Sequence, residues 1–218
     1  MRCEVPLTDG RRVLLVGAGA VGQAYGWHLQ RAGYQLSFFI KPRHRAHLEA
    51  ELSIHCLNGS ERGEHALADF SLVDDVAQVA AQEWDEVWLC MSSTALRGAW
   101  LDPFMAATGN ATIVMLQPGL QDRDYLLQRM PETRLVCGLI ALVSYQAPLP
   151  GEARQRSMVW WFPPLSPSSF SGPKERVESI VKALKKGGCP ARQTKDVRTT
   201  TALGSALLMP IIAALEVA

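Results

Sequence analysis

Cysteine is scarce in this sequence, and the cysteines that occur make no close pair. There are five in 218 residues, an odd number. They are Cys3, Cys56, Cys90, Cys137 and Cys189. The spacing contains no C-x-x-C pair, which argues against a disulfide framework and against a zinc finger. The pattern favours a reduced, cytoplasmic compartment.

An excess of charge of one sign is also missing. Lys and Arg total 22 against 21 for Asp and Glu, which leaves a formal net charge of +1. No basic stripe accompanies the tryptophans, so we expect no nucleic-acid partner. His44 and His47 share one expected helix face but have no third or fourth converging ligand. We therefore expect no metal site.

Long hydrophobic runs are the third thing this sequence lacks. The apolar run at residues 13–16 is too short for a signal peptide and leads into glycines. Residues 202–218 carry one charge, Glu216, but contain Pro210 and are short for a membrane span. We expect no membrane segment. The alternatives for this stretch are a core or dimer-forming helix and the opening helix of a further helical domain.

Strand and helix patterns alternate through the first half of the sequence, and the pattern changes after residue 130. Expected strands are residues 13–16, 35–40, 53–57, 66–70, 86–91, 112–116, 134–144 and 157–162, and expected helices are 20–31, 43–51, 74–81, 94–107, 176–186 and 199–218. This alternation predicts an α/β fold with a Rossmann-type, doubly wound, mostly parallel sheet. The sheet domain would span residues 1–195. Residues 196–218 would begin an α-helical C-terminal segment.

A glycine-rich loop joins the first expected strand to the first expected helix. It reads Gly17-Ala18-Gly19-Ala20-Val21-Gly22. Gly17 permits a tight turn, Gly19 lets a pyrophosphate approach the backbone, and Gly22 lets the helix pack closely. The first-turn N–H groups would then bind the pyrophosphate. This context predicts a dinucleotide site; the alternative is a glycine-rich turn without a ligand.

The residues after the second expected strand indicate which dinucleotide binds. An NAD site has an acid there to hold the ribose 2′-hydroxyl, whereas this sequence has Lys41, Arg43 and Arg45. Cations suit a 2′-phosphate, so we predict NADP(H), although a solvated basic helix start is the alternative. Met91, Ser92 and Gln117 follow later strands, where ligands of open sheets bind; they are expected cofactor contacts or ordinary loop and capping residues.

A family resemblance follows from these motifs. Residues 12–22, RVLLVGAGAVG, together with Lys41-Pro42-Arg43, resemble the N-terminal domain of the ketopantoate reductase (2-dehydropantoate 2-reductase) family. Residues 116–120 resemble that family's L-Q-N-G loop, and residues 196–215 resemble the entry helix of its C-terminal domain. The resemblance implies hydride transfer from NADPH to a 2-oxo acid, with a lysine as general acid and asparagine and serine groups holding the substrate.

Several positions depart from the family pattern. The catalytic lysine aligns with Thr201, the asparagine one turn later with Ser205, and the asparagine of the L-Q-N-G loop with Pro118. A lysine expected on the cofactor side is replaced near Met91. Two hypotheses follow: an NADPH-dependent reductase of a 2-oxo acid or related carbonyl, and a non-catalytic dinucleotide-binding or interaction protein. We also expect a truncated chain or a homodimer formed through the C-terminal helix.

Overall fold

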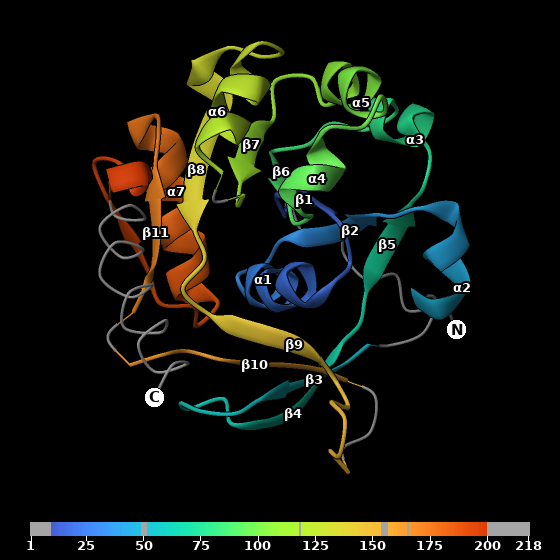
Figure 1. Ribbon diagram of the computed structural model, residues 1–218, viewed down its shortest axis with the longest axis vertical. Helices are drawn as coiled ribbons and strands as arrows, with labels where there is room; N and C mark the ends of the chain where they lie inside the picture. Colours follow the sequence, from blue (N-terminus) through green and yellow to red (C-terminus); the bar gives the residue numbers. More distant parts are fainter. Residues whose placement is uncertain (1–9, 49–51, 118, 154–156, 165, 200–218) are drawn as a thin grey trace, which may run out of the picture.

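A large sheet forms the centre of the molecule in the computed structural model, which describes residues 10–48, 52–117, 119–153, 157–164 and 166–199. Its strands are β1 (Arg12–Val16), β2 (Gln35–Phe39), β5 (Phe70–Val73), β6 (Glu86–Leu89), β7 (Thr112–Met115), β8 (Leu135–Leu139), β11 (Ser168–Ser171) and β12 (Ala191–Gln193). They lie in the order β12-β11-β8-β7-β6-β1-β2-β5 (Figure 1). Only β11 and β12 run against the other strands. The predicted fold class is therefore confirmed.

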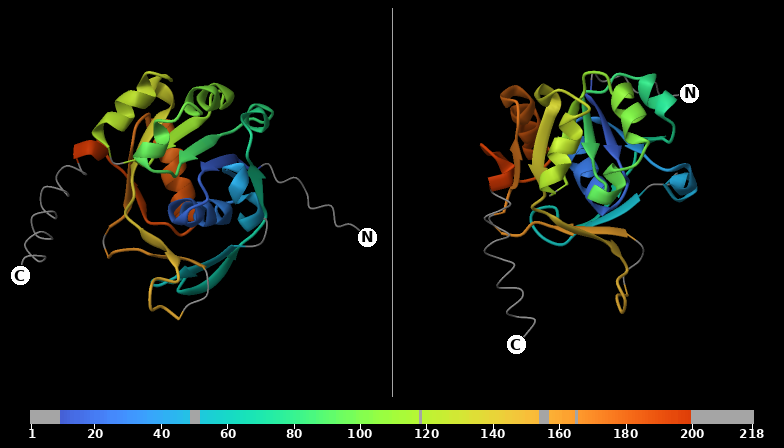
Figure 2. Two further views of the ribbon diagram at one scale, coloured as in Figure 1. Left: turned by 45° about the vertical axis from the view of Figure 1, so that its right-hand side comes forward. Right: turned by 45° about the horizontal axis from the view of Figure 1, so that its top comes forward.

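Helices cover both faces of this sheet (Figures 1 and 2). One face carries α1 (Ala20–Arg31) and α7 (Lys174–Lys186), and the other carries α3 (Val76–Ala80), α4 (Ser93–Leu96), α5 (Leu101–Ala107) and α6 (Leu120–Leu127). Along β1, Val13 and Leu15 pack on the α1 side, while Leu14 and Val16 pack on the other. Because both faces are covered, the strand is a continuous apolar run rather than an alternating one.

A second, smaller sheet lies beyond α1. It consists of β3 (Leu52–Cys56), β4 (Gly63–Leu67), β9 (Val143–Ala147) and β10 (Ser157–Trp161), in the order β4-β3-β10-β9. Figure 1 shows this sheet as a layer on the far side of α1 from the large sheet. Helix α1 is therefore enclosed from two sides, and every residue from Gly22 to Leu29 is buried. The sequence did not predict this second sheet.

The C-terminal half of α1 packs among aromatic rings and the end of α7. The His28 ring lies 4.9 Å from the Trp160 ring, centroid to centroid. His28 Nδ1 bonds the carbonyl oxygen of Gly187 at 2.8 Å. Burial lowers the pKa of His28 to about 4, so the imidazole is neutral at physiological pH. These contacts fix α1 firmly between the two sheets.

Three expected elements are divided differently in the structure. The expected strand 66–70 is shared between β4 and β5, and the expected strand 134–144 becomes β8 and β9, which lie in different sheets. The expected helix 94–107 is broken between α4 and α5, before Pro103 rather than at it. Pro103 lies in the first turn of α5, where a missing N–H leaves no helical hydrogen bond unmade.

Other elements were missed, or fall partly outside the described residues. Helix α6 and strands β11 and β12 were not predicted. The expected helix 43–51 is a 3₁₀ turn, Pro42–His44, followed by α2 (Arg45–Leu48), and the remaining residues are not described. A helix begins at residues 197–199, with Asp196 Oδ1 accepting from the Arg198 N–H at 3.0 Å. Residues 200–218 lie outside the described part, so the domain division stays a prediction.

The described helices contain no candidate for a membrane span, since none combines enough length with enough apolar character. The apolar stretch 202–218 lies outside that search. Within the same described ranges, no group of three or more histidine, cysteine or acidic side chains could hold a metal ion.

Candidate functional site

The carboxyl ends of the parallel strands meet at one edge of the large sheet. β1 lies between β2 and β6, and β7 and β8 continue the sheet beyond β6, all parallel. Ligands of open α/β sheets bind outside this edge. The glycine loop follows β1 and therefore lies centrally, with Lys41 after β2 on one side and Gln117 after β7 on the other.

The three glycines of the loop differ in what surrounds them. Gly17 has a φ of +104°, which L side chains rarely adopt. A Cβ on Gly22 would stand 2.1 Å from the Gly17 carbonyl oxygen, so a side chain there is excluded. A Cβ on Gly19 would have nothing within 4 Å beyond its chain neighbours. The loop therefore packs tightly at both ends and leaves its middle open.

The first turn of α1 presents unpaired backbone donors beside that opening. The first intrahelical hydrogen bond runs from the Gln23 N–H to the Gly19 carbonyl at 2.9 Å. The N–H groups of Ala20, Val21 and Gly22 precede it and have no partner within the helix. Gln23 Nε2 donates to the Ala18 carbonyl at 2.7 Å and holds the loop in shape. This arrangement fits the pyrophosphate of a dinucleotide, although the contact itself stays a prediction.

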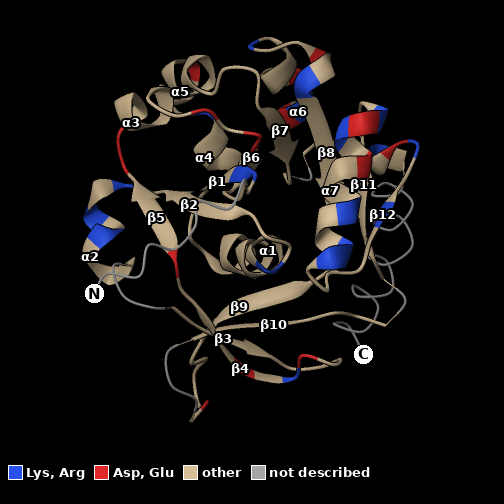
Figure 3. Ribbon diagram, turned by 180° about the vertical axis from the view of Figure 1, so that it is seen from behind, with Lys and Arg blue, Asp and Glu red and all other residues tan. Residues whose placement is uncertain are grey.

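Two cations stand exposed after β2. Lys41 follows the strand with an exposed side chain, which makes no hydrogen bond or ion pair with the described part of the chain, while its backbone carbonyl accepts from the His44 N–H at 2.9 Å. Arg43 is exposed in the 3₁₀ turn, where its Nε donates to His44 Nε2 at 3.3 Å. Figure 3 shows basic residues in the short helical segment that ends in α2, beside the end of β5. The positions of Lys41 and Arg43 fit a 2′-phosphate, and this role stays a prediction.

The third predicted cation is engaged within the protein. Arg45 Nε donates to Asp74 Oδ2 at 2.7 Å, and its terminal nitrogen donates to the Leu72 carbonyl at 3.2 Å. The hydrogen bond from the Arg45 side chain to its carboxylate lowers the pKa of Asp74. Asp74 follows β5, the neighbour of β2, and is an acid at this end of the sheet that the sequence did not point to. Arg45 neutralises it and is thereby less suited to a 2′-phosphate.

Gln117 joins the ends of β6 and β7. Its Nε2 donates to the Leu89 carbonyl at 2.9 Å and to the Met91 carbonyl at 2.7 Å. Its Oε1 is buried and has no hydrogen-bond partner among the described residues. An unpaired buried acceptor is costly, so a ligand donor there would be favourable. Ser92 Oγ instead accepts from the Ala95 N–H at 3.3 Å and caps α4.

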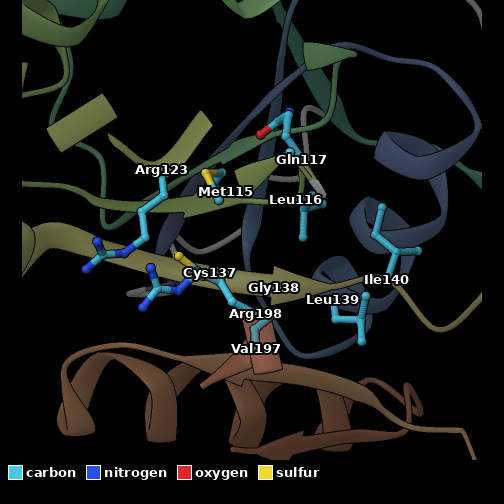
Figure 4. Close-up of a pocket in the computed structure, with 11 residues that line it drawn as sticks. Met115, Leu116, Gln117, Arg123, Cys137, Gly138, Leu139, Ile140, Val197 and Arg198 are labelled. Atoms are coloured by element: carbon cyan, nitrogen blue, oxygen red, sulfur yellow. The ribbon is translucent and has the colours of Figure 1, made fainter. Parts of the chain in front are cut away.

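A pocket of about 220 Å³ opens between the ends of β7 and β8 (Figure 4). Its apolar wall includes Met115, Leu116, Leu139, Ile140 and Val197. Gln117, Arg123 and Arg198 supply polar groups. The pocket lies on the far side of the glycine loop from Lys41, so a ligand extended across the edge would have one end near each.

The cysteine in this pocket, Cys137, is buried, and burial favours its protonated form. Burial raises the pKa of the Cys137 thiol, although the nearby guanidinium groups of Arg123 and Arg198 lower it. A protonated thiol reacts poorly, since the thiolate is the reactive form.

The sequence predicted Gln117 but neither arginine of the pocket. Arg123 lies on the missed helix α6, and the position of Arg198 against β8 follows from tertiary packing. Thr201, Ser205 and Pro118, which align with residues important in the family, fall outside the described residues. The structure therefore assigns no proton donor.

Comparison with known proteins gives a family and a fold. The family model "Ketopantoate reductase PanE/ApbA" matches residues 13–161. A 2-dehydropantoate 2-reductase of Nostoc sp. strain PCC 7120 is 26% identical over 134 residues, which are 62% of this chain and 40% of that protein. A crystal structure of 2-dehydropantoate 2-reductase from Methylococcus capsulatus is similar with a TM-score of 0.67 and 18% identity, over 87% of this chain and 59% of that chain.

Another similar structure is a D-mandelate dehydrogenase in a ternary structure with NADH and anilino(oxo)acetate. Its TM-score is 0.64 at 15% identity, over 84% of this chain and 56% of that chain. At such low identity the two structural similarities show the fold alone. The chain matches 40% of the length of the Nostoc reductase and less than two thirds of either structure.

Proposed function

Because the chain belongs to the ketopantoate reductase family, we propose that it binds NADPH and reduces the carbonyl group of a small 2-oxo acid. The observation that carries this proposal is the open backbone at Gly19, beside the N-terminus of α1 and between Lys41 and the pocket. The related proteins named above are a reductase and a dehydrogenase, which favours an oxidoreductase over the non-catalytic alternative.

The choice of NADPH rests on the charges after β2 and β5. An acid that would hold a ribose 2′-hydroxyl is missing after β2, where Lys41 and Arg43 stand instead. The nearby acid, Asp74, is paired with Arg45. A 2′-phosphate would therefore meet two exposed cations and a neutralised carboxylate. The fold alone leaves this choice open, since the D-mandelate dehydrogenase structure contains NADH.

Each part of the edge has a distinct task in the proposed reaction. The first-turn N–H groups of α1 bind the pyrophosphate, and Lys41 and Arg43 hold the 2′-phosphate. When bound, NADPH would supply a hydride to the carbonyl carbon, and the alkoxide oxygen would then need a proton from a general acid. Gln117 orients a donor group with its buried Oε1. The apolar wall of the pocket excludes water around the reacting carbonyl.

Assembly and location are also proposed. We expect a homodimer formed through the segment 196–218, which light scattering on the purified chain can test. We also expect a cytoplasmic protein. Four cysteines of the described part are free, namely Cys56, Cys90, Cys137 and Cys189, and free thiols are typical of a reducing compartment.

The direct test is a turnover assay that follows the loss of NADPH absorbance. Ketopantoate and a panel of small 2-oxo acids serve as substrates, and NADH replaces NADPH in a parallel series. We expect NADPH oxidation that requires a 2-oxo acid, and a lower rate with NADH. Tight NADPH binding without turnover of any 2-oxo acid would contradict the reductase and leave a dinucleotide-binding protein.

A further inference from the structure

Two arginines from distant parts of the chain meet at one end of the pocket. Arg123 comes from α6, and Arg198 comes from the helix that begins at residue 197. In Figure 4 their guanidinium groups lie at the same end of the pocket, next to Cys137. Both act electrostatically on the Cys137 thiol, which supports the same proximity.

Nearby carboxylates satisfy these guanidinium groups only in part. Arg123 hydrogen-bonds Glu132, and its second acidic contact, with Asp124, spans 3.8 Å. Both acids are largely exposed, with 68% and 72% of their side chains accessible, whereas Arg123 is only 20% exposed. Exposed carboxylates are screened by water and hold their partners weakly.

Arg198 has a similar surplus of donors. Its Nε lies 3.3 Å from Asp196 Oδ1. A guanidinium carries five N–H donors in a planar fork, so donors remain after this contact. Two like charges at one end of a pocket repel each other, and an anion between them relieves that repulsion. A carboxylate matches the fork best, because it accepts two parallel hydrogen bonds.

The rest of the pocket limits what else the anion can carry. Leu139 and Ile140 form an apolar wall, and Gln117 Oε1 is an unpaired acceptor. A small molecule with a carboxylate at one end and a short apolar group at the other would satisfy the two arginines and the apolar wall. The pocket volume of about 220 Å³ limits the occupant to a small molecule.

We propose that Arg123 and Arg198 form a carboxylate subsite that positions a small 2-oxo acid with its side chain toward Leu139 and Ile140. This inference rests on the proposed reductase function, because it places the substrate at the end of the sheet away from Lys41. It makes the two arginines specificity-determining residues that select 2-oxo acids over neutral ketones of the same shape.

A binding experiment without cofactor tests this subsite. Oxamate is titrated into the purified chain by calorimetry, and oxamide, its neutral analogue of nearly equal shape, is titrated in parallel. We expect oxamate to bind and oxamide to bind at least tenfold more weakly. Arg123→Gln and Arg198→Gln should each lower the affinity for oxamate at least tenfold and leave the affinity for oxamide unchanged. Lys185→Gln, an exposed change on α7, should match the wild type.

Two precautions keep the result decisive. If Arg123→Gln melts early because its contact with Glu132 is lost, Arg123→Lys replaces it. The lysine keeps the charge but loses the bidentate fork. The affinity for oxamate should therefore still fall, by a smaller factor. Equal oxamate affinity in wild type and both glutamine variants, or equal affinity for oxamate and oxamide, would overturn the subsite.

The outcome is separable from that of the reductase proposal. The titration needs no NADPH, so the subsite can stand if turnover fails. Conversely, if 2-oxo acids are reduced with an unchanged KM in both glutamine variants, the reductase stands and the subsite is rejected.

Discussion

The two ends of α1 meet opposite environments. Its first turn, at Gly19, faces open space at the edge of the large sheet and presents unpaired N–H groups. Its last turns, around Trp27 and His28, are enclosed between the two sheets and contact Trp160. The N-terminal end is accessible to a ligand, and the C-terminal end is fixed by packing.

The enclosed end of α1 supports the open end. A binding loop keeps its geometry only when the element behind it is rigid. The second sheet and the end of α7 supply that rigidity. The end of α7 packs so closely on α1 that a Cβ on Gly187 would stand 1.9 Å from the His28 carbonyl oxygen. Changes at the edge should therefore affect ligand binding alone, and changes at the enclosed end should affect stability alone.

The largest effect is expected where the two environments join, at Gly22. Replacement by valine forces a side chain against the Gly17 carbonyl, where a Cβ would already lie only 2.1 Å away. Overpacking of this kind costs about 1–3 kcal/mol. We expect both a lower melting temperature and loss of NADPH binding, measured by thermal melting and fluorescence titration. A variant with wild-type stability and affinity would break the account of the loop.

Gly19→Val is the matched change at the open end. Gly19 has an ordinary extended backbone, φ −76° and ψ −172°, and no atom beyond its neighbours would touch a Cβ there. We expect the melting temperature to stay within a degree or so of the wild type, since surface changes cost about 0.5 kcal/mol or less. NADPH affinity should fall more than tenfold. Unchanged affinity would show that the pyrophosphate does not pass over Gly19.

The enclosed end should respond to pH. The pKa of His28 is about 4 in the folded chain, against roughly 6.5 for an unperturbed histidine. The unfolded chain therefore binds more protons between these values. The contribution of His28 to the free energy of unfolding is fully present above pH 6.5. It is lost as the pH drops toward 4, by about 3 kcal/mol in all.

Replacing His28 by phenylalanine tests that pH dependence. Urea unfolding at pH 7 and pH 5 should show a smaller loss of stability in the variant than in the wild type. NADPH affinity at pH 7 should be nearly unchanged, because His28 lies in the enclosed part of α1. An identical pH slope in both proteins would refute the assignment.

Lys41 probes cofactor choice at the edge. Removing its charge should reduce the affinity for NADPH relative to NADH about tenfold, because one charge-assisted hydrogen bond at an exposed site is lost. Titration of Lys41→Ala with both cofactors measures the ratio, and Lys185→Ala on α7 is the exposed control. The 2′-phosphate assignment is wrong if the ratio stays at the wild-type value.

The smallest expected effect concerns Arg45. Its removal frees the Asp74 carboxylate at the end of β5. A free acid there repels a 2′-phosphate, so the NADPH preference of Arg45→Ala should fall several-fold. The Arg45→Ala/Asp74→Asn double variant should recover the preference. If the double variant does not recover the NADPH preference, Arg45 contacts the cofactor itself.

The sequence predicted the local structure around the glycine loop well. The loop between β1 and α1 is one continuous motif, and α1 has the predicted bounds, 20–31. Apolar periodicity and glycine spacing act over a few residues, so such a unit can be read from the chain directly.

Features that depend on tertiary packing could not be predicted in this way. The stretch 134–144 reads as one apolar strand, yet β8 and β9 separate into two sheets. β11 carries only one large apolar side chain, Phe170, among serines. Arg123 and Arg198 share a pocket only because α6 and the chain after β12 pack against β8. Arg45 pairs with Asp74 across a gap of 29 positions.

NADPH and NADH binding to the unmodified chain can be compared directly. If the edge around Gly19 and Lys41 is an NADPH site, the two cofactors should differ in affinity. Fluorescence titration at low and high salt should show binding of both cofactors, tighter for NADPH, with an advantage that shrinks as salt screens the cations. Binding of neither cofactor, or tighter binding of NADH, would contradict the account.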